Sequence, residues 1–262
     1  MAVGPSDPGR SPRWGFERVC GREFDCRHSG DVYYPPGIRG SVSYAVVFDL
    51  DDTLAVTDRD RETLLTAAAE RAGVSLSFDR PAYRDAHREH SGTESRRPVF
   101  EALVGDDAPE LTRAYRNVIG EELRAVDGAE ALLSTLRNRY RLGLLTDGPG
   151  RTQRDKLRRL DWSDAFDAVV ITGPIGAPKP DRRAFEAITA ELGVAPERAV
   201  YVGDDPDRDI EGAAGAGLTP IQVSYDGGPE PHPAAVATVP REDIGRLLGV
   251  LETLFEDGLE DA

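Results

Sequence analysis

Short apolar runs alternate with longer amphipathic stretches over most of this 262-residue chain. Five of the runs contain no charged residue, which is typical of strands buried on both faces of a sheet. They cover residues 44–48, 142–146, 168–172, 199–203 and 220–224. The stretches between and after them have apolar positions at helical spacing, over residues 128–138, 150–160, 181–192, 207–216 and 241–255. This alternation predicts an α/β fold with a doubly wound parallel sheet, whose right-handed crossovers place helices on both faces.

One connection is too long for this scheme, because about 90 residues separate the first strand from the second, and a loop of that length needs its own structure. Its helical pattern covers residues 59–72, 79–90 and 108–125, with the first stretch carrying a stripe of Leu64, Leu65, Ala68 and Ala69. We expect a small α-helical cap domain at residues 57–125, above the carboxyl ends of the strands, where open α/β sheets bind ligands. Residues 41–56 and 126–262 form the expected α/β core.

Residues 1–40 are rich in Gly, Pro, Ser and Arg and follow neither a strand nor a helix period. We interpret them as an irregular N-terminal extension. Cys20, Cys26 and His28 lack the paired spacing of a zinc site, so inert thiols are the preferred reading of these cysteines.

The charge balance limits the partners. A net charge of -15 and a pI near 4.8 argue against nucleic acid as the main ligand. Lys156 and Lys179 are the only lysines, so 30 of the 32 basic residues are arginines. The acidic, lysine-poor composition resembles proteins of salt-loving microbes, a reading we prefer to a merely GC-rich genome. Without a signal-like segment or an apolar run of roughly 18 residues, we expect a cytoplasmic monomer or homodimer with no membrane contact.

The stretch FDLDDTL crowds carboxylates at the end of the first strand. Asp49 and Asp51 are two residues apart, so on an extended segment both side chains point to one face. Two such carboxylates repel each other, and burying them is costly unless a cation compensates. Hard oxygen ligands in a compact site favour Mg²⁺. The alternative is an acidic turn at a strand end, and this short motif alone does not decide between the two.

Further polar residues follow the other strands. Thr146 and Asp147 end the second strand and lead into a helix, an arrangement suited to phosphate oxygens. Lys179 lies between two prolines in a chain that otherwise prefers arginine, which favours a functional ammonium group. Lys156, in the charged stretch RDKLRR, is expected to be solvated.

The fourth strand ends in another acidic group. Asp204 follows the apolar run directly and is the best metal ligand there. Asp209 is expected to orient the waters of the metal. Asp205 and Asp207 are expected to face solvent or to cap a helix.

Together these motifs resemble the haloacid dehalogenase superfamily of aspartate-nucleophile phosphohydrolases. The matching pattern is DxDx[TV] at residues 49–53, the threonine at 146, the lysine at 179 and GDxxxxD at residues 203–209. The resemblance implies a Rossmann-like core with strand order 5-4-1-2-3 and a helical cap of the C1 type.

The resemblance also assigns roles to individual residues. Asp49 would attack phosphorus, and Asp51 would act as general acid and base. Mg²⁺ would bind the Asp49 carboxylate, the backbone carbonyl of Asp51 and Asp204. Thr146, the amide of Asp147 and Lys179 would hold the phosphoryl oxygens, and Thr53 would support the loop. Asp147 stands where the family often has asparagine, which leaves the role of its side chain open.

Four residues of the expected cap could contact a substrate. Arg96 and Arg97 are candidates, although a solvated pair is preferred. His87 and His90 are three residues apart on an expected helix, and surface or packing roles are preferred because two histidines make an incomplete metal site.

The resulting prediction is a Mg²⁺-dependent phosphatase of a small soluble phosphomonoester. A dehalogenase is disfavoured because those family members lack the second catalytic aspartate and the metal site. A phosphomutase remains an alternative, since the same intermediate can be passed to a sugar hydroxyl. A non-catalytic regulatory protein that binds a phosphorylated ligand is the alternative from another class.

Overall fold

The computed structural model describes residues 44–90 and 93–257, and its centre is a six-stranded parallel sheet. The strands lie in the order β5-β4-β1-β6-β7-β8. Their bounds are β1 Ala45–Phe48, β4 Arg141–Thr146, β5 Ala168–Ile171, β6 Ala199–Gly203, β7 Thr219–Ser224 and β8 Ala237–Pro240. All five predicted strands are present, and their order is the expected 5-4-1-2-3. The edge strand β8, with its polar and proline-containing sequence ATVP, was missed.

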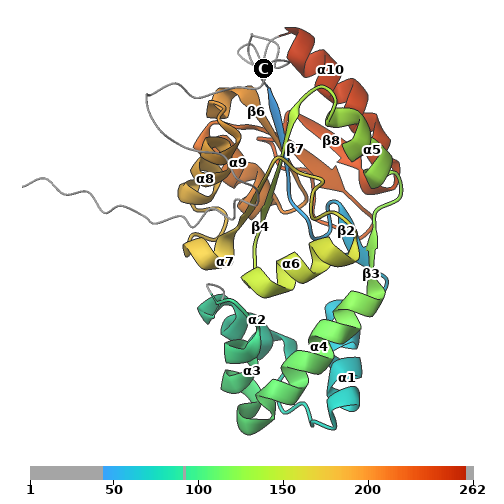
Figure 1. Cartoon of the computed structure of the whole chain (residues 1–262), viewed down its shortest axis with the longest axis vertical. Coiled ribbons are helices and arrows are strands. Elements are labelled where there is room, and N and C mark those ends of the chain that lie inside the picture. The colour runs from blue at the N-terminus through green and yellow to red at the C-terminus, as the bar shows by residue number, and fades with distance from the viewer. Residues whose placement is uncertain (1–43, 91–92, 258–262) are drawn as a thin grey trace, which may run out of the picture. The chain divides into compact units, whose positions relative to one another are not determined.

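Successive residues of β1 contribute to two different cores, as the two-residue period of a strand requires. Val46 and Phe48 belong to the hydrophobic cluster on one face of the sheet, whereas Ala45 and Val47 belong to the cluster on the other. Helices cover both faces of the sheet (Figure 1). The first face is covered by α5 Ala129–Leu136 and α10 Leu247–Asp257. The second face is covered by α8 Arg182–Leu192 and α9 Gly212–Ala216. The prediction of a doubly wound sheet is thus confirmed.

Two of the expected helices are interrupted. The segment predicted at 207–216 consists of a π-helical turn, η3 Pro206–Glu211, followed by α9. The segment predicted at 241–255 begins as a 3-10 helix, η4 Arg241–Arg246, before α10. The remaining helices of this part are α6 Gly150–Arg159, the four-residue α7 Thr172–Ile175 and the 3-10 turn η2 Pro196–Arg198.

The long insertion between β1 and β4 is helical, as expected. Figure 1 shows its helices grouped together, and they are α1 Arg61–Ala72, α2 Arg80–Glu89, α3 Arg97–Val104 and α4 Ala108–Glu122, with the 3-10 turn η1 Gly105–Asp107. They share a hydrophobic cluster of their own. Helix α3 was missed because its sequence, RPVFEALV, is short and has proline as its second residue. Asp60 caps α1 by accepting hydrogen bonds from the amides of Glu62 and Thr63.

The chain enters and leaves the helical insert through two paired strands, β2 Ala55–Thr57 and β3 Leu123–Ala125. They form an antiparallel ribbon in which Val56 faces Arg124.

The interpretation of residues 1–40, including the one for Cys20, Cys26 and His28, lies outside the described residues. Within the described ranges, no helix has the length and apolar character needed to cross a membrane.

Candidate active site

The carboxyl ends of the central strands surround one cavity of about 280 Å³. Asp49 and Asp51 follow β1, Thr146 ends β4 with Asp147 directly after it, and Asp204 follows β6. Lys179 reaches the same cavity from the segment between α7 and α8. Six of the seven predicted site residues therefore line this cavity, and Asp209 lies buried beside it, bonded to Lys179.

The loop after β1 turns tightly, which is how the two aspartates come to lie at the cavity. The amide of Asp49 still donates to the carbonyl of Val202 at 2.9 Å, as in the sheet. Asp52 then adopts a left-handed conformation with φ 63°, and the amides of Leu54 and Ala55 both donate to the carbonyl of Leu50. Aspartate tolerates this conformation better than most residues, so the acidic sequence also suits the turn.

Lys179 joins two buried carboxylates. Its Nζ donates to Asp49 Oδ1 at 2.7 Å and to Asp209 Oδ1 at 2.6 Å, and it lies 3.0 Å from the Tyr201 hydroxyl. Burial alone would lower the pKa of Lys179, but Asp209 and Asp49 outweigh it and raise the pKa well above its usual value. The ammonium group is therefore charged at every pH at which the protein would be assayed.

Asp209 can approach Lys179 because Gly203 leaves room for it. A Cβ atom on Gly203 would lie 2.5 Å from Asp209 Cγ, a distance that real contacts do not reach. The glycine of the GDxxxxD motif is thus required by the close packing of Asp209 over the end of β6.

Three carboxylates form a set that fits a metal ion. Asp49, Asp204 and Asp209 each offer an oxygen, and these oxygens lie within 4.8 Å of one another. With Lys179 they leave a formal charge of 3 × (-1) + 1 = -2, which a divalent cation would balance. Burial, followed by the neighbouring charges of Asp209 and Asp52, raises the pKa of Asp204 to about 7. Burial likewise raises the pKa of Asp49 well above its usual value, and the nearby charge of Lys179 offsets this only in part.

Asp51 does not join that set through its carboxylate, which is held by helix α6 instead. Lys156 Nζ lies 2.5 Å from both of its oxygens, and Gln153 Nε2 donates to Oδ2 at 3.0 Å. Burial would raise the pKa of Asp51, but the Lys156 charge outweighs it and lowers the pKa below its usual range. The expectation of a solvated Lys156 was wrong, since its side chain is buried. Arg158, two residues further on, is exposed.

Removing the Lys156 charge should destabilise the protein. In Lys156→Met, the Asp51 carboxylate keeps only Gln153 as a hydrogen-bond partner among the described residues, so we expect the free energy of unfolding to fall by about 2 kcal/mol. The matched control is Arg158→Met on the same helix, whose exposed ion pair should contribute less than about 0.5 kcal/mol. Urea unfolding of both variants at neutral pH measures the difference, and equal effects would contradict the pairing.

The remaining predicted residues have specific partners. Thr146 Oγ1 accepts from Gln153 Nε2 at 2.6 Å, and Thr53 Oγ1 donates to Asp204 Oδ1 at 3.3 Å. Asp147 Oδ1 accepts from the Thr172 hydroxyl at 2.7 Å and from the Lys179 amide at 3.1 Å, so its side chain fixes the lysine-bearing segment.

The two acids next to Asp204 behave as expected. Asp205 caps η3 by accepting hydrogen bonds from the amides of Asp207 and Arg208, and Asp207 is exposed.

The helical insert contributes a basic wall to the cavity. Arg61, Arg80, Arg84 and Arg96 all line it, together with Tyr83 and His87. Among the described residues, none of these four arginines forms an ion pair with a carboxylate. The preference for a solvated pair at 96 and 97 was half wrong, because Arg96 is buried whereas Arg97 is exposed and pairs with Glu101.

The two histidines differ in position. His87 lines the cavity, and burial together with the nearby Arg96 lowers its pKa to about 3, so the ring is neutral. His90 ends α2. Neither belongs to a metal-binding group in the part of the chain that the structure describes.

Sequence reasoning missed three groups of site residues: Gln153 and Lys156 on α6, Tyr201 on β6, and Arg61, Arg80 and Arg84 of the insert. A signal existed for Lys156, because the scarcity of lysine that drew attention to Lys179 applies to it equally. The arginines had no such signal in a chain with 30 of them.

Known proteins resemble the chain in sequence. Residues 45–217 match the family of haloacid dehalogenase-like hydrolases. A glyceraldehyde 3-phosphate phosphatase of Methanopyrus kandleri is 32% identical over 231 residues, covering 81% of this chain and 99% of the relative. A phosphoserine phosphatase of Thermus thermophilus is 31% identical over 224 residues, covering 71% of this chain and 90% of the relative.

The fold has solved counterparts as well. The crystal structure of a putative β-phosphoglucomutase from Thermotoga maritima superimposes with a TM-score of 0.60 at 26% identity, covering 80% of this chain and 99% of that one. The family match spans all the residues of the acidic cluster as well as Lys179. The chain therefore belongs to the haloacid dehalogenase-like hydrolases, as one of their phosphoric monoester phosphatases.

Proposed function

We propose that this protein hydrolyses a small phosphomonoester through an aspartyl-phosphate on Asp49, with Mg²⁺ as its cofactor. The observation that carries the proposal is the cavity at the strand ends, which brings Asp49, Lys179 and Thr146 together with Asp51. A nucleophile, a cation for the phosphoryl oxygens and an acid/base group are thus supplied to one substrate-sized space.

The first step belongs to Asp49. One of its carboxylate oxygens attacks phosphorus, the bond from phosphorus to the ester oxygen breaks, and the alcohol leaves. Lys179, bonded to Asp49 Oδ1, holds the nucleophile in place and offers its charge to the phosphoryl oxygens. Thr146 and the amide of Asp147 are the further donors that we assign to these oxygens.

The second step needs a base, and Asp51 fits that role. The pair with Lys156 keeps its carboxyl ionised, the form that takes a proton from the water attacking the aspartyl-phosphate. The side chain is 34% exposed, so it exchanges protons with the cavity. To protonate the leaving alcohol in the first step, Asp51 must first gain a proton. An anionic substrate that approaches Asp51 favours the protonated form of this carboxyl group.

Asp49 and Asp204 are the residues that we propose as carboxylate ligands of Mg²⁺, with the backbone carbonyl of Asp51. Asp209 lies within the same group of oxygens but also bonds Lys179, so we assign it to positioning both. The bound ion would supply positive charge to a substrate phosphate and to the carboxylates around it.

The substrate should be small and anionic, because the cavity measures about 280 Å³ and the insert lines it with four arginines. These arginines overcome locally the net charge of -15, which otherwise repels phosphate esters. We propose that residues 57–125 act as the cap that selects the substrate. Glyceraldehyde 3-phosphate and phosphoserine, named for the two relatives above, are the first compounds to assay.

Metal removal tests the proposal. Dialysis against EDTA should abolish phosphate release from p-nitrophenyl phosphate, glyceraldehyde 3-phosphate and phosphoserine, and added Mg²⁺ should restore it. Asp204→Asn should need at least about tenfold more Mg²⁺ for half-maximal activity, because it loses one charged ligand. Undiminished turnover in EDTA would exclude the metal.

A phosphomutase is the second candidate, favoured by the structural similarity to a putative β-phosphoglucomutase. The two functions differ in the acceptor of the phosphoryl group, which is water in one and a sugar hydroxyl in the other. Incubation with glucose 1-phosphate separates them: the phosphatase releases inorganic phosphate, whereas the mutase forms glucose 6-phosphate.

A further inference from the structure

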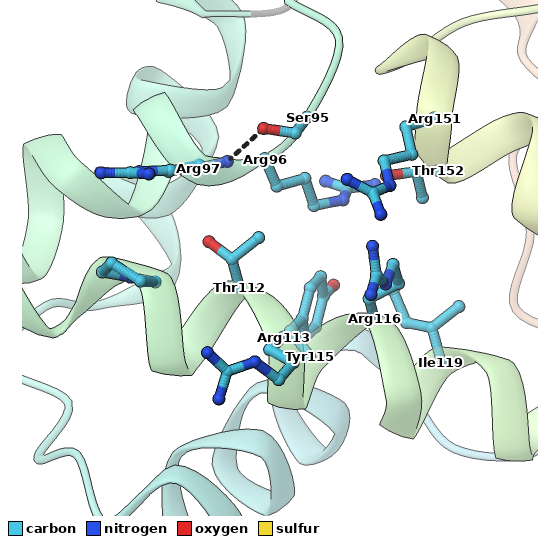
Figure 2. A pocket seen from close by; sticks show the side chains of 11 residues that line it. Ser95, Arg96, Arg97, Thr112, Arg113, Tyr115, Arg116, Ile119, Arg151 and Thr152 are labelled. Atoms are coloured by element: carbon cyan, nitrogen blue, oxygen red, sulfur yellow. Dashed lines mark hydrogen bonds between the residues drawn. The ribbon is translucent and has the colours of Figure 1, made fainter.

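A second cavity, of about 240 Å³, lies between the helical insert and the start of α6. Its walls come from α3, α4 and the first residues of α6 (Figure 2). Arg96 is the one residue that this cavity shares with the catalytic cavity. We call it the arginine cavity, because Arg96, Arg97, Arg113, Arg116 and Arg151 line it and no acidic residue of the described chain does.

The five arginines fall into two groups. Figure 2 shows the guanidinium groups of Arg96, Arg116 and Arg151 turned toward one another across the cavity. Arg97 and Arg113 point away, and they pair with Glu101 and Glu110 on their own helices. The first group thus gathers three positive charges in a chain whose net charge is strongly negative.

The converging group has little compensating negative charge. Arg116 has a distant partner in Asp155 at 3.7 Å, whereas Arg96 and Arg151 form no ion pair with any described carboxylate. Three like charges at close range are unfavourable unless an anion lies between them.

Arg96 gives the second, independent indication of a ligand. Its side chain is only 6% exposed, and its Nε has no hydrogen-bond partner among residues 44–90 and 93–257. One terminal nitrogen donates to the Tyr83 hydroxyl at 2.8 Å, so the side chain is fixed in place. The buried Thr112 Oγ1, on the wall opposite, also lacks a hydrogen-bond partner within the same described ranges. Buried donors without partners are costly, and a ligand that accepts hydrogen bonds would satisfy both.

We propose that the arginine cavity is an anion-binding site, distinct from the acidic cluster, which takes the phosphate or carboxylate group of a small organic molecule. Arg96, Arg116 and Arg151 bind the anionic group, and Thr112 donates to it. The ring of Tyr115, Pro109 and Ile119 form an apolar wall for a short carbon chain. The volume admits a molecule of a few carbon atoms.

A bound anion would affect the catalytic residues through helix α6. The anion would join Arg116 of the insert to Arg151 of α6, the helix that also supplies Gln153 and Lys156 to Asp51. It would therefore hold the insert against the helix that positions the proposed base. The anionic group can belong to a separate small molecule or to the far end of a substrate that extends past Arg96.

Binding of sulfate to the full chain tests the site. Calorimetric titration at low, constant ionic strength compares Arg116→Gln/Arg151→Gln with the control Arg97→Gln/Arg113→Gln, which loses the same charge from arginines that point away. We expect at least about tenfold weaker binding at one site in the first variant, and less than about twofold change in the control. Equal losses in both, or no loss in either, would overturn the proposal. The single variant Arg151→Gln, at an exposed position, shows the same direction if folding of the double variant is impaired.

Steady-state kinetics distinguish the two possible sources of the anionic group, a substrate or a separate molecule. This kinetic test rests on the proposed function. If the substrate supplies it, the Arg116→Gln/Arg151→Gln variant raises KM for 3-phosphoglycerate but not for p-nitrophenyl phosphate. If a separate molecule supplies it, both KM values stay unchanged, and sulfate alters the turnover of the wild type but not of the variant at saturating substrate, where sulfate no longer competes in the catalytic cavity. The titration itself does not depend on catalysis, since Asp49→Asn should bind sulfate at this site as tightly as the wild type.

Discussion

Asp49→Asn is expected to lower phosphate release from every tested monoester by about 10⁴-fold or more, because it removes the proposed nucleophile. The same change should stabilise the metal-free protein. Burial raises the pKa of Asp49, so its ionised form is unfavourable in the fold at neutral pH, and a neutral amide of similar shape relieves this. We expect a gain of about 1 kcal/mol or more in the free energy of unfolding.

Both effects are measured on one preparation, by phosphate release with Mg²⁺ and by urea unfolding in EDTA. Asp127→Asn is the control, because Asp127 is 97% exposed and should change neither quantity. A variant that keeps turnover would refute the role of Asp49. A variant that loses activity and stability together would show that the carboxylate supports the fold instead.

Lys179→Met should cause the largest loss of stability, about 3–5 kcal/mol, because it leaves Asp49 and Asp209 buried without their shared cation. Activity should fall at least about 10²-fold in addition, since the charge that faces the phosphoryl oxygens is lost. The raised pKa of Lys179 means that its contribution is complete below pH 10.5 and is lost only as the pH rises through the folded-state value.

The double variant Lys179→Met/Asp209→Asn separates the charge effect from the loss of packing. Removing the Asp209 charge should restore part of the lost stability, because only one of the two carboxylates that Lys179 bonded then lacks its cation. Arg182→Met serves as the surface control, with an exposed ion pair to Glu186 and an expected effect below about 0.5 kcal/mol. If Lys179→Met has the same urea midpoint of unfolding as the wild type, the ion pairs of Lys179 with Asp49 and Asp209 contribute nothing to stability.

The sheet could be predicted from the sequence because its strands are buried on both faces. Runs such as AVVF and AVYVG have no polar position, so each could be recognised without knowing its neighbours. The clustering of the acidic residues at the strand ends could then also be predicted, since parallel strands bring their carboxyl ends to one edge of the sheet. β8 could not be recognised in this way, because its four residues, ATVP, include an exposed threonine and a proline and resemble a loop, whereas β5 at the other edge has the wholly apolar sequence AVVI.

The residues that escaped prediction act across long sequence distances. Lys156 meets Asp51 over 105 positions, and its own surroundings, RDKLRR, look like a solvated helix face. The same applies to Arg96, whose burial depends on how α2, α3 and α4 pack around Tyr83 and Tyr115. The local pattern of apolar and polar residues identifies a helix or strand and its buried face. It does not show which charged side chains become buried when these elements pack together.

The burial of both lysines has a consequence for how the surface responds to alkali. Lys156 and Lys179 are 4% and 5% exposed, so across residues 44–90 and 93–257 the cations in contact with water at high pH are guanidinium groups. These groups keep their protons beyond pH 12. Pairs such as Arg71 with Glu121 should therefore persist in strongly basic solution, where an amine-based surface would already have lost its charge.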